Sequence, residues 1–379
     1  MEPKIKKTLR IAFIGVNLLI VTLYILACLV PFVNAGKFWV VALAGLVFPL
    51  LFFAMLGFLI YWMIRRSKWM WVCMVVILMG WRQAGVVFSF TGSSKIVTAK
   101  NAETLRVLSW NLSSWGRTNR THPDNHQQQM VELIKNTGAD VLCLQEYIYF
   151  INKMYCDTLI PALKKSGYQY IYFGKTNYFK RIYKSTILNT VVIVSKYPIV
   201  DTAQYNYPVI NDTDHAEALI YADIKVNNTI IRIFTTHLQS VSFGNTDYEA
   251  LHNLKEPAAA SVTQSKALVT KLRIGYKKRT TQADKLHEKI IQSPYPAIVC
   301  GDFNDVPSSY TYFTAKGNLQ DAFLKKGIGF GRTFRLISPT LRIDYILADK
   351  KFEVTGFNKI EVNYSDHYPI IADFEMPKK

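Results

Sequence analysis

Ionisable and amide side chains recur in this sequence at one kind of place, directly beside short apolar runs. They are Asn111 after RVLSW, Glu146 after DVLCLQ, His237 after RIFTT, Asp302 and Asn304 after AIVCG, Asp344 within RIDYIL, and Asp366 and His367 shortly before PIIADF. An isolated Ser-Asp-His segment is usually a surface turn. If the apolar runs are core strands, however, their ends converge at one edge of the sheets, and a shared site explains the whole set better than unrelated turns.

The residue types in this set restrict the chemistry. Carboxylate and amide oxygens, without a cysteine group or a histidine-rich cluster, suit a hard divalent cation such as Mg²⁺ or Mn²⁺ better than Zn²⁺. Two histidines and several further carboxylates then allow general acid–base catalysis on an anion whose charge the metal neutralises. Phosphate esters fit that description.

The elements that would position these side chains begin after residue 103. Short runs rich in β-branched and aromatic residues predict strands at 105–112, 139–148, 190–199, 218–226, 229–238, 296–304, 342–349 and 369–376. Stretches 126–138 and 261–292 are helical in pattern. The Asn227-Asn228 pair between two alternating runs predicts a hairpin. The pattern indicates an α/β fold with mixed sheets and helices outside them.

The first 92 residues predict a separate unit, a membrane anchor. Residues 11–33 carry no charged side chain over a length sufficient to cross a hydrocarbon core of about 30 Å, and residues 38–64 repeat the pattern. Residues 69–90 form a third candidate that Arg82 and Gln83 interrupt, so this segment either spans or lies partly in the interface. A cleaved signal peptide is disfavoured because a second apolar run follows closely.

The basic residues of this segment predict its orientation. Lys4, Lys6, Lys7 and Arg10 precede the first apolar run, and Arg65, Arg66 and Lys68 lie between the second and third. The positive-inside rule places both groups in the cytoplasm. Three crossings would make the chain a multi-pass protein of the inner or plasma membrane with its catalytic domain, residues 104–379, on the extracytoplasmic side. If 69–90 does not cross, that domain faces the cytoplasm.

Composition adds a modest preference for anionic partners. The formal net charge is +18, of which the first 94 residues, with nine Lys or Arg and one Glu, supply +8 and the remainder +10. A positive catalytic region favours polyanions or anionic membrane surfaces, although ordinary solvated lysines give the same balance. The five cysteines show neither metal-ligand spacing nor a disulfide framework. Residues 93–103, polar and rich in small side chains, predict a linker.

Short motifs in this order resemble those of the endonuclease/exonuclease/phosphatase superfamily. They are W-N at 110–111, Q-E at 145–146, S-K-Y-P at 195–198, T-H-L at 236–238, G-D-F-N at 301–304, R-I-D-Y-I at 342–346 and S-D-H-Y-P at 365–369. The resemblance covers about residues 104–375, and its most specific parts are G-D-F-N and the C-terminal S-D-H-Y-P. It implies a four-layer α/β sandwich, in which two packed mixed sheets are flanked by helices, and a metal-dependent phosphoesterase activity.

The resemblance also implies a metal site. Glu146 would be the principal ligand of Mg²⁺ or Mn²⁺, with Asn111 beside it and Asp366 completing the shell. Ser113 stands where abasic-site endonucleases place a further acidic residue, which argues against that repair subclass.

Catalytic roles follow from the same resemblance. Asp302 would position or deprotonate the attacking water, and Asn304 would hold a phosphate oxygen. His367 would contact the scissile phosphate with its ring oriented by Asp344, because a carboxylate partner fixes an imidazole tautomer. His237 would lie on the phosphate or leaving-group side.

Three functions remain open from the sequence. The favoured one is a membrane-anchored phosphodiesterase acting on nucleic acid. A phospholipase C or sphingomyelinase-type lipid phosphodiesterase, or another phosphatase, is the alternative, because the anchor would hold the domain near lipid headgroups. A catalytically inactive membrane scaffold is disfavoured by the complete set of polar residues. The bilayer is the expected partner of the N-terminal helices, and no protein partner is inferred.

Overall fold

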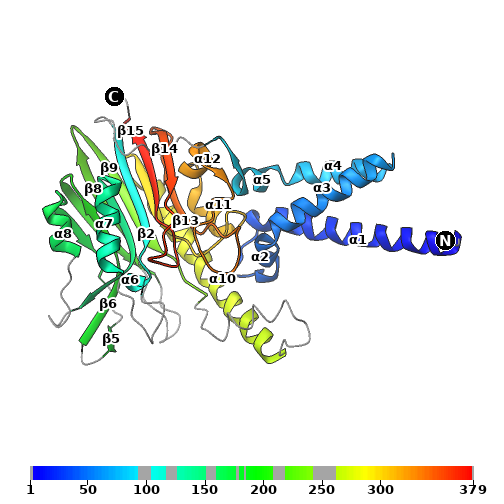
Figure 1. The fold of residues 1–379 in the computed structure, drawn as a ribbon, viewed down its shortest axis with the longest axis horizontal. Coiled ribbons are helices and arrows are strands. Elements are labelled where there is room, and N and C mark those ends of the chain that lie inside the picture. Colours follow the sequence, from blue (N-terminus) through cyan, green and yellow to red (C-terminus); the bar gives the residue numbers. More distant parts are fainter. Residues whose placement is uncertain are drawn as a thin grey trace.

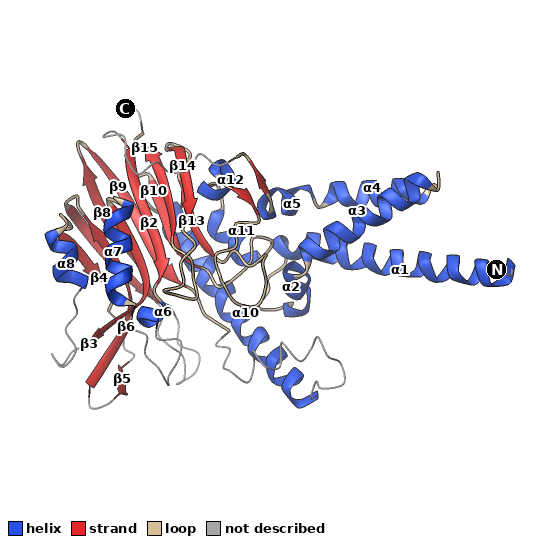
Figure 2. Cartoon of the chain, viewed as in Figure 1, coloured by secondary structure: helices blue, strands red, loops and turns tan. Residues whose placement is uncertain are grey.

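The fold was analysed in a computed structural model, shown by position in the sequence and by secondary structure in Figures 1 and 2. The structure describes residues 3–92, 104–116, 126–150, 159–175, 179–182, 185–207, 218–241 and 262–377. The predicted linker, 93–103, lies outside these residues, as does Cys156.

Two mixed β-sheets pack face to face, which confirms the predicted α/β sandwich. The seven-stranded sheet has the order β14 (Glu353–Lys359), β15 (Ile370–Glu375), β2 (Thr104–Asn111), β3 (Val141–Phe150), β6 (Ser185–Ser195) and β4 (Tyr170–Phe173), with β5 (Phe179–Ile182) also paired to β6. The six-stranded sheet has the order β11 (Gln320–Asp321), β13 (Asp344–Ala348), β10 (Ala297–Asp302), β9 (Thr229–His237), β8 (Ala218–Val226) and β7 (Ile199–Asn206). Aliphatic side chains of both sheets, such as Val107, Ile193, Ile220 and Ile298, form the core between them.

Helices cover the outer face of each sheet (Figure 2). The outer face of the seven-stranded sheet packs with α7 (Gln127–Thr137) and α8 (Leu159–Lys165), through a second apolar cluster that includes Trp110, Met130 and Leu163. The six-stranded sheet packs against α10 (Val262–Ile291) and α11 (Tyr310–Lys316), with Leu286 and Tyr312 in a third cluster. Short helices α6 (Ser113–Gly116) and α12 (Ala322–Lys326) complete this part of the chain.

Strand direction brings particular chain ends together. β2 runs parallel to β3, with Asn111 opposite Gln145, and β9 runs parallel to β10, with His237 opposite Asp302. The carboxyl ends of parallel neighbours share one sheet edge. β13 is antiparallel to β10 and begins there, so Asp344 lies opposite Asp302. β15 is antiparallel to β2, which places the residues just before β15 at the same edge.

Buried ion pairs support these strand registers. Arg106 on β2 donates to both carboxylate oxygens of Asp373 on β15, at 2.8 and 2.9 Å. Arg232 on β9 makes the same two-bonded contact with Asp223 on β8, at 2.7 Å for each bond. The predicted hairpin between β8 and β9 is present, with Asn227 at φ +53° in its turn. A register slip would leave each of these charges buried without its partner, which is costly.

The N-terminal residues form apolar helices. They are α1 (Pro3–Leu29), the 3₁₀ turn η1 (Val30–Phe32), α2 (Trp39–Leu46), α3 (Phe48–Ile64), α4 (Trp69–Met79) and α5 (Trp81–Val87). One helical stretch, Lys7–Phe32, is long and apolar enough to cross a membrane. The other two predicted segments are each a bent pair of helices, α2 with α3 at 65° and α4 with α5 at 60°, so up to three spans are possible if each pair counts as one.

Each bend has a local cause. Pro49 lies in the first turn of α3, where it cannot continue a preceding helix because its ring restricts the residue before it. The α4–α5 break falls at Gly80, whose Cβ position is occupied by the ring of Tyr24 from α1. A side chain at this position would displace that ring. The α2–α3 bend therefore follows from the proline in the sequence, and the α4–α5 bend follows from packing against Tyr24.

One buried polar residue links the three long helices. Asn17 of α1 is fully buried, accepts a hydrogen bond from Nε1 of Trp62 on α3 at 3.2 Å, and lies 3.7 Å from Sγ of Cys73 on α4. Polar contacts of this kind fix the relative positions of helices in an apolar environment, where van der Waals packing alone discriminates poorly.

The helices are attached at one end to the domain built from the two sheets, and they project from it at the other (Figure 1). At the attached end, Ser308 Oγ donates to the carbonyl of Gly45 at 2.7 Å, and Arg342 donates to the carbonyl of Val86 at 2.6 Å. Strand β1 (Ser89–Phe90) also pairs with β12 (Ile328–Gly329). Arg82 lies at this junction, with its guanidinium 5.3 Å from the Phe32 ring centroid and 5.8 Å from that of Phe313.

Candidate active site

The strand ends bring the eight predicted site residues together. Half of them come from the seven-stranded sheet and its loops, namely Asn111, Glu146, Asp366 and His367, and half from the six-stranded sheet and its loops, namely His237, Asp302, Asn304 and Asp344. Direct side-chain contacts connect seven of the eight, and Asp366 is close enough for its charge to act on Glu146. The site therefore forms where the two sheets meet.

Glu146 is directed into the site by an irregularity of β3. The pairing of β3 with β6 shifts between Leu144 and Tyr147, and Glu146 has φ +49°, in the left-handed region. A bulge of this kind re-aims a side chain, and a non-glycine residue keeps such a conformation only when its surroundings impose it. The preceding Gln145 supplies part of that restraint, because its Nε2 donates to Thr235 Oγ1 of the opposite sheet at 3.0 Å.

Asn111 connects the carboxylates of the two sheets. Its Nδ2 donates to Oε1 of Glu146 at 3.2 Å and to Oδ2 of Asp302 at 3.0 Å. Its Oδ1 accepts the backbone N–H of Ser113 at 2.9 Å. The fully buried amide thus holds one carboxylate from each sheet at a fixed separation.

Asp302 has a histidine on either side. Its Oδ2 lies 3.5 Å from Nε2 of His237 and 3.6 Å from Nε2 of His367. Its Oδ1 accepts the backbone N–H of Asn304 at 2.8 Å, and Asn304, at φ +51°, turns its Nδ2 to within 2.9 Å of His237 Nε2. The same Nδ2 donates to the carbonyl of Leu238 at 2.9 Å. The loop after β10 is therefore folded back onto the end of β9.

His367 and Asp344 form a buried pair. The His367 Nδ1 lies 2.9 and 3.1 Å from the two carboxylate oxygens of Asp344, which leaves Nε2 directed toward Asp302. The ring of Phe334 packs edge-on against the imidazole at 5.0 Å between centroids. The backbone carbonyl of His367 also accepts Nε1 of Trp110 at 3.0 Å. A carboxylate on Nδ1 fixes the ring orientation and makes the imidazole more basic.

Burial and neighbouring charges shift the proton affinities in the site. Desolvation raises the pKa of Glu146, and the charge of Asp366 raises it further. Burial also raises the pKa of Asp302 to about 6, against the opposing effect of His367. Burial lowers the pKa of His367, but the carboxylates of Asp344 and Asp302 outweigh it, so the net pKa is well above the ordinary value. Carboxylates crowded in this way favour a bound cation.

The described residues offer hard donors for a metal ion. Asp302, Asp344 and His367 each present a donor atom, and these atoms lie within 4.8 Å of one another. Because Asp344 already engages Nδ1 of His367, these residues also have the geometry of an oriented acid–base group. Glu146, with Asp366 nearby, supplies a second set of carboxylate oxygens. Oxygen donors of this kind suit Mg²⁺ or Mn²⁺.

Several residues that support the site were not predicted from the sequence. Ser365 donates from Oγ to the carbonyl of Asn111 at 2.8 Å and accepts the N–H of His367 at 3.1 Å, so it ties the last loop to β2. Thr333 Oγ1 accepts the N–H groups of Ile343 and Asp344 at 3.0 and 3.1 Å. Only the S-D-H motif pointed to Ser365, and no sequence signal pointed to Thr333.

Two further side chains beside the site are buried. Arg279 on α10 is 2% exposed and pairs with Asp305 at 3.2 Å and with the carbonyl of Gln239 at 3.0 Å. It therefore anchors the loop after β10 rather than facing solvent. Tyr147, directly after Glu146, is fully buried in the core.

Comparisons with known proteins agree with this architecture. Residues 108–367 match the sequence model described as the Endonuclease/Exonuclease/phosphatase family, and residues 9–87 match one described as a domain of unknown function. An endonuclease/exonuclease/phosphatase from Beutenbergia cavernae is similar in structure, with 18% identity, a TM-score of 0.50 and 72% of each chain covered. The catalytic domain of human Nocturnin with bound sulfate anion is similar at 19% identity and TM-score 0.50, covering 72% of this chain and 93% of that one. No curated protein matches the sequence.

Gly301, directly before Asp302, offers a test of how the site is held. A Cβ at this position would collide with the backbone carbonyl of Thr236 on β9. We expect Gly301→Ala to lower the free energy of unfolding by roughly 2 kcal/mol and to lower activity, because β10 must shift away from β9 beside Asp302. Thermal unfolding and turnover of the full-length protein measure both effects.

Gly57→Ala in α3 is the matched control, because a Cβ there meets nothing within 4 Å. It should leave turnover unchanged and should not lower stability, because alanine favours a helix more than glycine does. Wild-type behaviour of Gly301→Ala would contradict the close approach of β9 and β10 at the site.

Proposed function

The chain belongs to the endonuclease/exonuclease/phosphatase family, and on this premise we propose that it is a membrane-anchored, divalent-metal-dependent phosphodiesterase that acts on nucleic acid. The observation that carries the proposal is the position of Asp302. Its carboxylate lies between Nε2 of His237 and Nε2 of His367 and accepts a hydrogen bond from the amide that also holds Glu146. Metal ligands, a base and two imidazole groups for a phosphate are thereby within a few ångströms of one another.

Glu146 is our choice as the principal metal ligand, with Asp366 and Asn111 beside it. The donor set fits a hard cation, because desolvation and Asp366 both raise the pKa of Glu146 and a positive ion would relieve that repulsion. A divalent cation bound there would neutralise phosphate charge during attack. The Asn111 Oδ1 already accepts the Ser113 N–H. A role of Asn111 as a metal ligand therefore stays a prediction, whereas its Nδ2 hydrogen bonds to both carboxylates are present in the structure.

We assign the remaining residues the roles that the family resemblance implies, and their geometry is consistent with these roles. Asp302 takes the proton of the attacking water, since a base with a pKa near the working pH is most effective. Water forms the new bond to phosphorus as the ester bond breaks, and the leaving oxygen takes up a proton. His367, oriented by Asp344, binds a phosphate oxygen through Nε2. His237 and Asn304, which contact each other at 2.9 Å, bind the phosphate on the leaving-group side.

Nucleic acid is preferred as the substrate because the chain after residue 94 carries a net charge of about +10. The similar Nocturnin domain holds a sulfate, which is a tetrahedral oxyanion like phosphate. A lipid phosphodiester is the second candidate, because the contacts of Arg342 with Val86 and of Ser308 with Gly45 hold the domain directly against the apolar helices. An inactive scaffold is disfavoured by the assembled site.

The membrane arrangement we propose has three crossings. The N-terminal basic cluster and the α3–α4 turn, with Arg65, Arg66 and Lys68, lie at the same end of the helices, away from the catalytic domain (Figure 1). Arg82 belongs to the opposite end, where it contacts Phe313 of the domain, and so does not lie in the middle of the apolar helices. The positive-inside rule then favours a cytoplasmic basic end and an extracytoplasmic catalytic domain.

Activity should depend on a divalent metal and on the assembled acid–base residues. With Mg²⁺ or Mn²⁺, the full-length protein in detergent should cleave a soluble chromogenic phosphodiester and nucleic acid, and chelation should abolish cleavage until metal is restored. His367→Ala and Asp302→Asn should each lower turnover by roughly 10²–10⁴-fold without changing thermal stability enough to unfold the chain. Turnover is compared on RNA, plasmid DNA, sphingomyelin and inositol phosphates.

The control is Lys164→Gln on α8, an exposed lysine outside the proposed site, which should retain full turnover. Cleavage of sphingomyelin without cleavage of nucleic acid would reverse the order of the two substrates. Full turnover by Asp302→Asn and His367→Ala would refute the assigned roles.

Sidedness can be measured with an impermeant thiol reagent. The experiment uses a variant that lacks Cys156, in which the four remaining cysteines are buried. Labelling of a newly introduced cysteine then reports the accessibility of that position alone. Lys351→Cys, exposed after β13, should be labelled from outside intact cells, whereas Ser67→Cys in the α3–α4 turn should be labelled only after permeabilisation. The reverse pattern would place the catalytic domain in the cytoplasm.

A further inference from the structure

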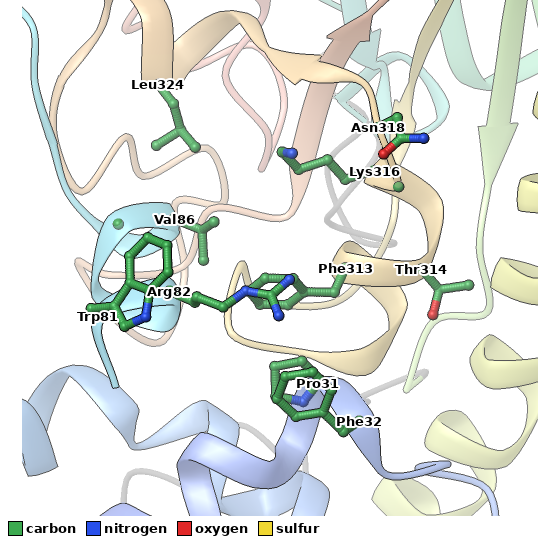
Figure 3. A pocket seen from close by; sticks show the side chains of 12 residues that line it. Pro31, Phe32, Trp81, Arg82, Val86, Phe313, Thr314, Lys316, Asn318 and Leu324 are labelled. Carbon is green, nitrogen blue, oxygen red and sulfur yellow. The ribbon is translucent and has the colours of Figure 1, made fainter. Parts of the chain in front are cut away.

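A cavity of about 580 Å³ lies where the N-terminal helices join the catalytic domain. Figure 3 shows its walls, which come from η1, α5, α11 and Leu324 of α12. It shares no lining residue with the active site. Its described lining contains two cations, Arg82 and Lys316, and no acidic side chain. A pocket with this charge balance is suited to an anion.

Arg82 is held in place by aromatic rings. Its guanidinium lies 5.3 Å from the Phe32 ring centroid and 5.8 Å from that of Phe313. Cation–π contacts of this kind orient the guanidinium plane and leave its N–H groups available to an oxyanion. Within the described part of the chain, Arg82 forms no ion pair with a carboxylate.

Lys316, in the last turn of α11, reaches toward the same space from the opposite wall (Figure 3). Burial lowers its pKa, and the positive charges of Lys350, Arg82 and Lys325 add to that effect. The nearby Asp321 acts in the opposite direction, but its carboxylate is already bound to Arg342 at 2.6 Å. The pocket therefore concentrates positive charge that no described lining residue neutralises.

The rim of the pocket is apolar and exposed. Phe32 is 64% exposed and Trp81 is 70% exposed, and both lie at the end of the helices that adjoins the catalytic domain. Aromatic residues at this position in a membrane protein sit at the level of the lipid headgroups. A basic pocket bordered by such residues can bind the phosphate of a lipid while its chains follow the apolar helix surfaces.

We propose that this pocket binds the headgroup phosphate of an anionic phospholipid between Arg82 and Lys316, with the acyl chains along the exposed faces of η1 and α5. The lipid is a bound structural ligand rather than the substrate. The proposal rests on the membrane anchoring in the proposed function and is independent of the catalytic chemistry. Inorganic phosphate shares the headgroup chemistry, so the experiment must separate these two sources.

The test uses full-length protein in nanodiscs of phosphatidylcholine mixed with phosphatidylglycerol. After release into mild detergent, native mass spectrometry counts the lipids that stay bound. Wild-type protein should retain phosphatidylglycerol in preference to phosphatidylcholine, and the double variant Arg82→Gln with Lys316→Gln should retain roughly tenfold less. The double variant Lys164→Gln with Lys165→Gln, which removes the same charge from exposed positions on α8, should behave as wild type.

Equal retention by wild type and the pocket double variant would overturn the proposal, as would equal retention of both lipids by wild type. Saturable binding of inorganic phosphate to delipidated protein, lost in the pocket variant but without retained phosphatidylglycerol, would assign the pocket to a soluble anion and overturn the lipid assignment. Failure of the chain to enter nanodiscs would instead refute the anchoring. Turnover of the soluble phosphodiester, measured on the same samples, should be unchanged in the pocket variant and reports separately on the catalytic proposal.

Discussion

Side-chain contacts between the two sheets hold the site together, and the amide of Asn111 makes two of its hydrogen bonds at this junction. Asn111 ends a strand of one sheet, and its Nδ2 donates to Glu146 of that sheet and to Asp302 of the other. Neither sheet contains the site alone, because each supplies half of its residues. The arrangement therefore depends on the core between the sheets, where side chains such as Val107 and Ile298 are fully buried. A change that loosens the packing of that core would therefore also disturb the geometry of the site.

The cost of this arrangement is electrostatic. Carboxylates that would be ionised in water are brought together in a desolvated space, and the pKa values of Glu146 and Asp302 rise as a result. Left-handed backbone conformations at Glu146 and Asn304 add local strain. Both features are typical of functional sites, where the surroundings impose an arrangement that the isolated segments would avoid. A bound cation would offset the repulsion.

Much of the fold and the grouping of the site residues followed from sequence, for a simple reason. Strands buried on both faces give continuous apolar runs, and polar residues just beyond parallel strands meet at one edge. Features that depend on tertiary contact were not predictable. The bulge that turns Glu146 inward, the bend at Gly80 against Tyr24 and the burial of Arg279 against Asp305 each require a partner distant in the chain.

The central claim is that these converging strand ends hold a hard cation opposite the pair formed by His367 and Asp344. Anomalous diffraction from crystals of the full-length protein grown with Mn²⁺ tests it most directly. The account predicts one strong peak within coordination distance of the Glu146 carboxylate, on the side that faces Asp302. Crystals with Mn²⁺ elsewhere on the protein, and none beside Glu146 or Asp302, would contradict it.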